Sequence, residues 1–272
     1  MSEIPAEQDG AGRWSERHGD GAASAGPPPS PSAHSYSVIW MRPTARGRGP
    51  QPAHSRESIA AAAVRLADEH GFEAVSMRRI AAEIGAGTMS LYRYVPRKED
   101  LVDLMIDQVS GEQLAPDPTG DVRADLFEAA RRQRALIHRH PWLVQALRTA
   151  PSPGPNSLRF MDGMLAILEA TNLGPTEKFE AIALLTGGVR SFVEFELLQQ
   201  LREQQSGISA EQYQQAETAY MTSVVLSGEY PHLARVAMEN AAAGAGGESA
   251  PAVDPDALFE RMLARTLDGV MG

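Results

Sequence analysis

Two short helical patterns joined by a glycine-containing turn, within residues 76–98, restrict the possible folds of this chain more than any other feature. Ser76 is a preferred N-cap, because its hydroxyl accepts from the free N–H groups of a first helical turn. Ile80 and Ile84 share one apolar helix face, and Gly85 follows where a helix end favours a residue that tolerates positive φ. The first helix is therefore expected to end at this glycine.

A second helix is expected to begin after Gly87 and to run about two turns to Val95, because Pro96 disfavours the α conformation in the residue before it. Leu91 and Val95 would face inward. The residues expected on its other faces are Thr88, Met89, Ser90, Tyr92 and Tyr94. Such a helix-turn-helix, with hydroxyl and aromatic groups outward, suits the DNA major groove, which admits one helix.

The formal net charge of −10 is unevenly divided along the chain. Residues 42–100 carry ten basic against seven acidic side chains, whereas residues 1–41 and 101–272 are both net acidic. A positive region around the helix-turn-helix is what attraction to phosphate requires. The distribution favours double-stranded DNA as the partner of this segment and predicts that the acidic remainder stays off the DNA.

The composition excludes several classes of site. The absence of cysteine rules out disulfides, thiolate metal sites and a cysteine nucleophile. No apolar run approaches the roughly 18 residues of a membrane span, and the first 35 residues lack the basic and apolar segments of a signal peptide. We expect a soluble cytoplasmic protein with no membrane partner and no cofactor.

Three segments are expected along the chain. Residues 1–53 combine a Gly-, Pro- and Ser-rich stretch, expected to be disordered, with an arginine-containing segment that is either a basic arm in a DNA groove or a solvated tail. Residues 54–114 hold the helix-turn-helix, a supporting helix before it and a linking helix after it. Residues 115–120 (APDPTG) contain proline and glycine, which interrupt helices, and they separate this module from a helical domain over residues 120–272.

Helical periodicity continues to the C-terminus without a strand-like alternation, which predicts an all-α bundle. The supporting helix should begin at Ser55, which lacks a full capping box because Ser58 replaces the usual Glu or Gln, and end at Gly71. The linking helix is expected over residues 99–113. The remaining helices are expected over residues 121–140, 141–150, 157–172, 176–205, 210–226, 231–242 and 254–270.

The stretch from Arg56 to Met105 resembles the DNA-binding module of tetracycline-repressor-like (TetR family) transcriptional regulators. A helix-Gly-Phe junction, an R-R-I-A-x-x-I-G helix, an L-Y-R-Y-V segment and a K-E-D-L restart follow one another at that family's spacing. The resemblance implies a homodimer that places two recognition helices in successive major grooves of a pseudo-palindromic operator. It also implies release from DNA by a small-molecule effector, although the C-terminal helices are similar to the family's ligand-binding domain in layout only.

The same resemblance implies which residues touch DNA. They are Arg78, Thr88, Met89, Ser90, Tyr92, Tyr94 and Lys98. As alternatives, Arg78 would pair with Glu83 on a solvated face, and the two tyrosines would be packing residues with hydrated hydroxyls. Gly87 stands where many family members have a polar cap, which predicts that the recognition helix is loosely held until DNA orders it.

A ligand pocket between the C-terminal helices would be lined by bulky apolar side chains and a few polar groups. The candidates are Trp142, Phe160, Met164, Phe192, Phe195, His138 and Arg190. An ordinary helical core is the alternative for the apolar residues, and His138, Arg190 and Glu194 are the candidates for a polar clamp. No metal site is expected, because His138 and His140 lie on divergent helix faces with no nearby acid.

Two long helices offer a dimer interface in which they and their symmetry mates would form a four-helix, isologous contact. Their apolar residues are Leu184, Leu185, Val189, Phe192 and Val193 in the first, and Leu258, Met262, Leu263 and Leu267 in the second. Gly187 and Gly188 each cost about 1 kcal/mol relative to alanine within a helix. They indicate either a close helix approach or a kink at the ligand site.

We expect a sequence-specific transcriptional repressor that responds to a ligand. A ligand-independent regulator or an activator with the same fold is the alternative. An enzyme is a more distant alternative, because the chain has no nucleophile elbow, phosphate loop or close constellation of acid, histidine and serine.

Overall fold

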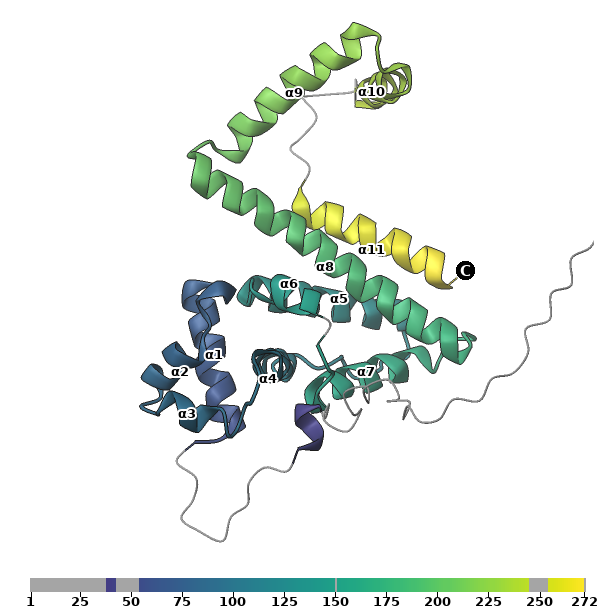
Figure 1. Ribbon diagram of the computed structural model, residues 1–272. Helices are drawn as coiled ribbons and strands as arrows, with labels where there is room; N and C mark the ends of the chain where they lie inside the picture. The colour runs from purple at the N-terminus through teal and green to yellow at the C-terminus, as the bar shows by residue number, and fades with distance from the viewer. Residues whose placement is uncertain (1–37, 43–53, 150, 245–253, 272) are drawn as a thin grey trace, which may run out of the picture. The chain divides into compact units, whose positions relative to one another are not determined.

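Helices account for the regular structure of this protein, and the computed structural model describes them over residues 38–42, 54–149, 151–244 and 254–271 (Figure 1). No strand occurs within these ranges, so the predicted all-α class is confirmed. None of the described helices is both long and apolar enough to cross a membrane. The disorder expected for residues 1–35, and Arg46 and Arg48 of the expected basic arm, lie outside the described residues.

The N-terminal module consists of α1 (Arg56–His70), α2 (Met77–Glu83) and α3 (Thr88–Leu91), followed by the linking helix α4 (Lys98–Ser110). Helix α1 packs against α2 and α4. Their facing sides supply the apolar core that the periodicity predicted. Its fully buried residues include Ile59, Ala63, Ile80, Leu91, Val95, Leu101 and Met105.

The start of α1 corrects one expectation. Ser55 Oγ accepts from Ser58 N at 3.1 Å, and Ser58 Oγ accepts from Ser55 N at 2.9 Å. A full capping box is therefore present, because a serine hydroxyl reaches the same N–H group that a Glu or Gln side chain would. The helix ends at Gly71 with a φ of +82°, as predicted.

A short 3-10 turn, η1 (Ile39–Met41), joins the fold ahead of α1. Ile39 is fully buried, and Trp40 Nε1 donates to the carbonyl oxygen of Ser152 at 3.2 Å. Arg56 Nη1 donates to the carbonyl oxygens of Ile39 and Arg42, each at 3.1 Å. This part of the segment expected as an arm or tail is thus an integral part of the core.

Seven helices follow the linking helix. They are α5 (Val122–Arg139), α6 (Leu143–Ala146), α7 (Pro155–Leu168), α8 (Pro175–Ser206), α9 (Ala210–Ser227), α10 (Pro231–Gly244) and α11 (Pro255–Met271). Helix α8 packs against α5, α7 and α11, and α9 packs against α10 (Figure 1). Helix α6 is one turn long instead of the expected 141–150, because a 3-10 turn at Leu147–Thr149 replaces its second half.

Several residues expected at a dimer interface pack inside the protomer instead. Leu185, Val189, Val193, Leu263 and Leu267 are buried between α8 and α11 or in the adjoining core, and the Phe192 ring lies 5.2 Å from that of Phe259. Leu184 and Leu258 remain exposed. Helix periodicity marks an apolar face but does not say whether the same chain or another copy covers it.

Helix α8 continues without interruption through Gly187 and Gly188. A Cβ at Gly188 would lie 3.6 Å from Met262 Sδ, which is an ordinary contact, and one at Gly187 would meet no described atom within 4 Å. Neither glycine is required by packing within the protomer.

Candidate nucleic-acid interface and internal cavity

The turn between α2 and α3 has the predicted geometry. Ser76 Oγ accepts from Arg79 N at 3.3 Å and caps α2. Gly85 has a φ of +68°, and the next residue, Ala86, donates its N–H to the carbonyl oxygen of Ala81 at 2.8 Å. The chain thereby reverses within three residues, and the predicted helix-turn-helix is confirmed.

Helix α3 is shorter than predicted. It ends at Leu91, and the N–H groups of Tyr94 and Val95 both donate to the Leu91 carbonyl oxygen at 2.9 Å. Residues 92–94 thus form a hydrogen-bonded turn instead of a second helical turn. Gly87 provides no side-chain cap, so the single turn of α3 is held mainly by the buried side chains of Leu91 and Val95.

The residues expected to reach DNA lie on α3 and on the turn that follows it. Met89 is 79% exposed and Tyr92 is 43% exposed, whereas Thr88 and Ser90 are half-buried. Tyr94 is half-buried and packs against the core, with the Arg93 guanidinium 5.9 Å from its ring centroid. Tyr94 thus has the packing role of the alternative interpretation, and its contact with DNA stays a prediction.

Arg78 and Lys98 are both exposed near the ends of their helices. The predicted alternative partner of Arg78 is taken, because Glu83 Oε1 pairs with Arg65 Nη2 at 2.7 Å. Arg78 has no ion pair among the described residues. Lys98 is the first residue of α4, and its Nζ lies 5.9 Å from the centroid of the Phe72 ring. Both side chains are exposed at the surface, and their contact with phosphate stays a prediction.

Other arginines of the basic region are tied to a buried carboxylate. Asp100 is 1% exposed, and its Oδ2 accepts from Arg42 Nη1 and Arg97 Nε, each at 3.1 Å. These two guanidinium groups balance one internal charge. Arg97 therefore has a structural role at the start of α4.

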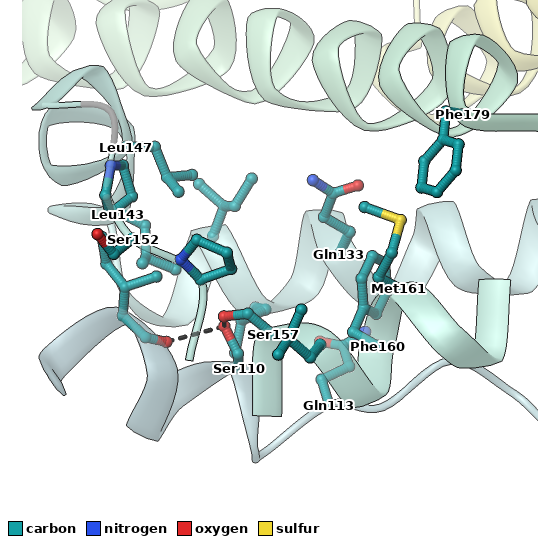
Figure 2. A pocket seen from close by; sticks show the side chains of 16 residues that line it. Ser110, Gln113, Gln133, Leu143, Leu147, Ser152, Ser157, Phe160, Met161 and Phe179 are labelled. Carbon is teal, nitrogen blue, oxygen red and sulfur yellow. Dashed lines mark hydrogen bonds between the residues drawn. The ribbon is translucent and has the colours of Figure 1, made fainter. Parts of the chain in front are cut away.

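The C-terminal helices line a partly open cavity of about 480 Å³ (Figure 2). Its wall is formed by the end of α4, by α5, α6, α7 and the loop before α7, and by Phe179 of α8. An adjacent hollow shares Leu158, Met161 and Phe179 with it. The lining residues are Ile106, Ser110, Gln113, Gln133, Leu136, Ile137, Leu143, Leu147, Pro151, Ser152, Pro153, Ser157, Leu158, Phe160, Met161 and Phe179.

Of the seven residues predicted to bind ligand, only Phe160 lines this cavity. Met164 is fully buried in the core, Phe192 packs on Phe259, and Phe195 is exposed. Trp142 stacks on Phe72 with ring centroids 6.4 Å apart and donates Nε1–H to Asp68 Oδ1 at 2.7 Å. These side chains are bulky and apolar, as a pocket requires, but Trp142, Met164 and Phe192 pack elsewhere in the core and Phe195 faces solvent.

The predicted clamp of His138, Arg190 and Glu194 does not form. His138 Nε2 lies 2.9 Å from Glu196 Oε2, and Arg134 Nε donates to the same oxygen at 3.0 Å. Glu196, two residues beyond Glu194, faces α5 because residues two apart point to different sides of a helix. Arg190 makes no hydrogen bond or ion pair with the described residues.

Helix α4 is fastened to the loop that forms one cavity wall. Asp103 Oδ1 accepts from Ser152 N at 3.0 Å, and Asp107 Oδ1 accepts from the N–H groups of Asn156 and Ser157 at 2.8 and 3.0 Å. Burial raises the pKa of Asp103 above its ordinary value, and the Ser152 N–H opposes that rise only in part. The loop and the first turn of α7 therefore depend on two carboxylates of α4.

A second connection joins the N-terminal module to the end of α5. His140 is buried, with Nδ1 2.7 Å from Asp68 Oδ1 and Nε2 3.2 Å from Glu112 Oε2. Burial acts to raise the pKa of Glu112, but hydrogen bonds from His140 and Arg139 outweigh it and leave that pKa below its ordinary value. Among the described residues, no cluster of three or more histidines and acids has metal-binding geometry.

Comparison with known families supports this arrangement. Residues 59–105 match the family described as bacterial regulatory proteins of the tetR family, and residues 115–271 match the tetracyclin repressor-like C-terminal domain. The chain belongs to the TetR family. The resemblance found in the sequence is confirmed, and with it the assignment as a helix-turn-helix transcriptional regulator.

Relatives and a solved TetR structure extend the comparison. The HTH-type transcriptional repressor DrrR1 of Streptomyces coeruleorubidus is 38% identical over 74% of this chain and 76% of its own. An HTH-type transcriptional regulator of Saccharopolyspora erythraea is 32% identical over 59% of this chain and 68% of its own. The TetR family protein ActR of Streptomyces coelicolor, solved in complex with (S)-DNPA, shares the fold with a TM-score of 0.64, at 23% identity over 80% of this chain and 97% of that one.

The uncapped recognition helix of this TetR protein leads to a prediction for the free state. Amide hydrogens of residues 87–95 should exchange at least about 100-fold faster than those in the middle of α1 and α4, because α3 is one turn long and has no side-chain cap. Hydrogen-exchange mass spectrometry with and without DNA measures this difference. Slow exchange of α3 without DNA would contradict the prediction.

Proposed function

We propose that this protein is a homodimeric repressor that binds operator DNA through α3 and is released by a small-molecule effector in the cavity. One observation carries the proposal: α4 begins at Lys98, directly after the recognition turn, and its other end supplies Ile106 and Ser110 to the cavity wall. A molecule in the cavity therefore acts on the helix attached to the DNA-binding module. The name of DrrR1 as a repressor and the ActR complex support the same function.

The loop before α7 provides the route by which an effector would move α4. Pro151, Ser152 and Pro153 line the cavity, and Asp103 holds Ser152. An occupant that displaces this loop would pull on α4 through the carboxylate. A ligand releases DNA only if it binds the displaced arrangement more tightly than the DNA-bound one.

The remaining exposed face of α8 suits the dimer contact. Leu184, Phe195 and Leu198 are exposed, and with Ser191 they recur at intervals of seven, four and three residues, so they share one side of the helix. Ser191 and the open Gly187 would let a partner helix approach closely. The two subunits would then present two α3 helices to a pseudo-palindromic site.

An activator or a ligand-independent regulator is the alternative with the same fold. Sequencing of genomic DNA bound by the purified protein would locate the operator, and its position relative to a promoter separates repression from activation. A small molecule that abolishes this binding in a gel-shift assay supports the effector role. Absence of any sequence-specific site would overturn the proposed function.

Two kinds of α3-region variant should behave differently. Lys98→Ala should weaken binding to all sequences alike, because a phosphate contact carries no sequence information. The slope of log affinity against log salt concentration should become shallower by about 1 per subunit, because one phosphate contact is lost. Thr88→Ala or Ser90→Ala should change which bases are preferred. Binding titrations against an operator library at several salt concentrations measure both, and Lys178→Ala on α8 is the matched control. An unchanged salt slope in Lys98→Ala would exclude that contact.

A further inference from the structure

The cavity wall is built from uncharged side chains. None of the sixteen lining residues is an Asp, Glu, Lys, Arg or His, and their polar groups are serine hydroxyls and glutamine amides. Burying an ion against such a wall leaves it without a counter-charge, which costs far more than burying a neutral group. The wall chemistry therefore selects against ionised occupants of either sign.

The charges behind the wall strengthen the selection against anions. Asp103 and Asp107 are buried, and each directs a carboxylate oxygen to backbone N–H groups of the wall segment. They engage donors that a carboxylate or phosphate ligand would otherwise use. Their negative field also lies next to Ser152 and Ser157, which line the cavity.

One lining side chain has a polar group that lacks a partner. The Gln113 Nε2 atom is buried and has no hydrogen-bond partner among the described residues. By contrast, Gln133 Nε2 donates to the Thr186 carbonyl oxygen of α8 at 3.3 Å, and Figure 2 shows Gln133 reaching up toward that helix. A buried N–H group left unpaired costs about 1–3 kcal/mol, so an occupant that pairs with it gains affinity.

We propose that the effector is an uncharged, mainly apolar molecule of drug size with a carbonyl-type oxygen that accepts a hydrogen bond from Gln113. This inference rests on the proposed function, because it names the ligand class of the same cavity. Phe160, Phe179 and Met161 supply flat and polarisable surfaces for its apolar part. Gln113 lies three residues beyond the end of α4, so the bond would fix the ligand close to the helix that leads to the DNA-binding module.

Three probes of nearly equal shape test this class. 9-Fluorenone has the carbonyl, fluorene lacks it, and 9-fluorenone-2-carboxylate adds a negative charge. By titration calorimetry on the full chain, 9-fluorenone should bind about five- to tenfold more tightly than fluorene, which is the affinity equivalent of one net hydrogen bond. The carboxylate should bind at least about 100-fold more weakly than 9-fluorenone.

The Gln113→Leu variant tests whether the preference for 9-fluorenone comes from the Gln113 amide or from the shape of the cavity. It should abolish the preference for 9-fluorenone while fluorene binds as well as before, which also shows that the cavity is intact. Gln145→Leu is the matched control, because Gln145 is exposed on α6 and outside the lining. That variant should keep the preference.

Equal binding of fluorene and 9-fluorenone, tightest binding of the carboxylate, an undiminished preference in Gln113→Leu, or no binding of any probe would each overturn the inference. Operator binding by the same variants is measured separately. Loss of sequence-specific DNA binding would count against the proposed function, whereas the ranking of the probes concerns the effector class alone.

Discussion

Replacing Met89 with glutamate is expected to weaken operator binding by at least about 100-fold. Met89 is 79% exposed in the middle of α3, so the change should leave the fold intact. If α3 lies in the major groove, the new carboxylate is placed among phosphates and base edges, and like-charge juxtaposition costs several kcal/mol. Each 1.4 kcal/mol corresponds to a factor of ten in affinity.

Fluorescence anisotropy with a labelled operator measures the effect, and circular dichroism confirms that helix content is unchanged. Met238→Glu is the control, because it adds the same charge at an exposed methionine of α10. It should alter affinity by less than about threefold, as expected for a distant and screened charge. If both variants lost affinity equally, the effect would come from net charge, and α3 would not be the recognition element.

The N-terminal module was predictable because its signals are local. Ser76 and Gly85 act through hydrogen bonds and backbone conformation within a few residues, and the structure places both as predicted. The early end of α3 was harder to foresee, because Pro96 restricts Val95 but does not specify how the turn before it closes. The second half of the capping box was missed for a similar reason. The usual pattern requires Glu or Gln at this position, whereas here the Ser58 hydroxyl accepts from Ser55 N.

The cavity was not predictable in the same way. Bulky apolar residues such as Trp142 and Met164 have the composition of a pocket wall, but tertiary packing turns them into core. The residues that do line the cavity include Gln113 and Ser152, from a helix end and from a loop that the sequence marked only as a separator. The available signal for the cavity was Gln113, a polar residue shortly after the largely apolar end of α4. Its meaning depends on α7 packing against α4, which no local pattern encodes.

Removing the carboxylate of Asp100 is expected to destabilise the N-terminal module strongly. Asp100 is almost fully buried and accepts from Arg42 and Arg97. Breaking a buried ion pair costs about 3–5 kcal/mol, and the partial exposure of both arginines reduces this to about 2–3 kcal/mol for Asp100→Ala. Urea unfolding followed by helix content measures the loss in the free energy of unfolding.

Glu99→Ala is the matched control, because Glu99 is an exposed neighbour in the same first turn of α4. It removes the same charge but only a helix-terminus interaction of about 0.3–1 kcal/mol. A loss for Asp100→Ala no greater than that of Glu99→Ala would show that the buried carboxylate is not what holds the two arginines.

A double-mutant cycle between Asp100 and Arg42 identifies what the lost stability came from. Arg42 belongs to the segment that carries Ile39 into the core, and its side chain ties that segment to Asp100, while Arg56 donates to the carbonyl oxygens of Ile39 and Arg42. If the ion pair anchors this segment, Arg42→Ala in the Asp100→Ala background should cost at least 1 kcal/mol less than Arg42→Ala alone. Additive losses would mean that Asp100 stabilises the module chiefly through Arg97, at the start of the linking helix. The N-terminal segment would then be held by Arg56, by the buried Ile39 and by the hydrogen bond from Trp40 to Ser152.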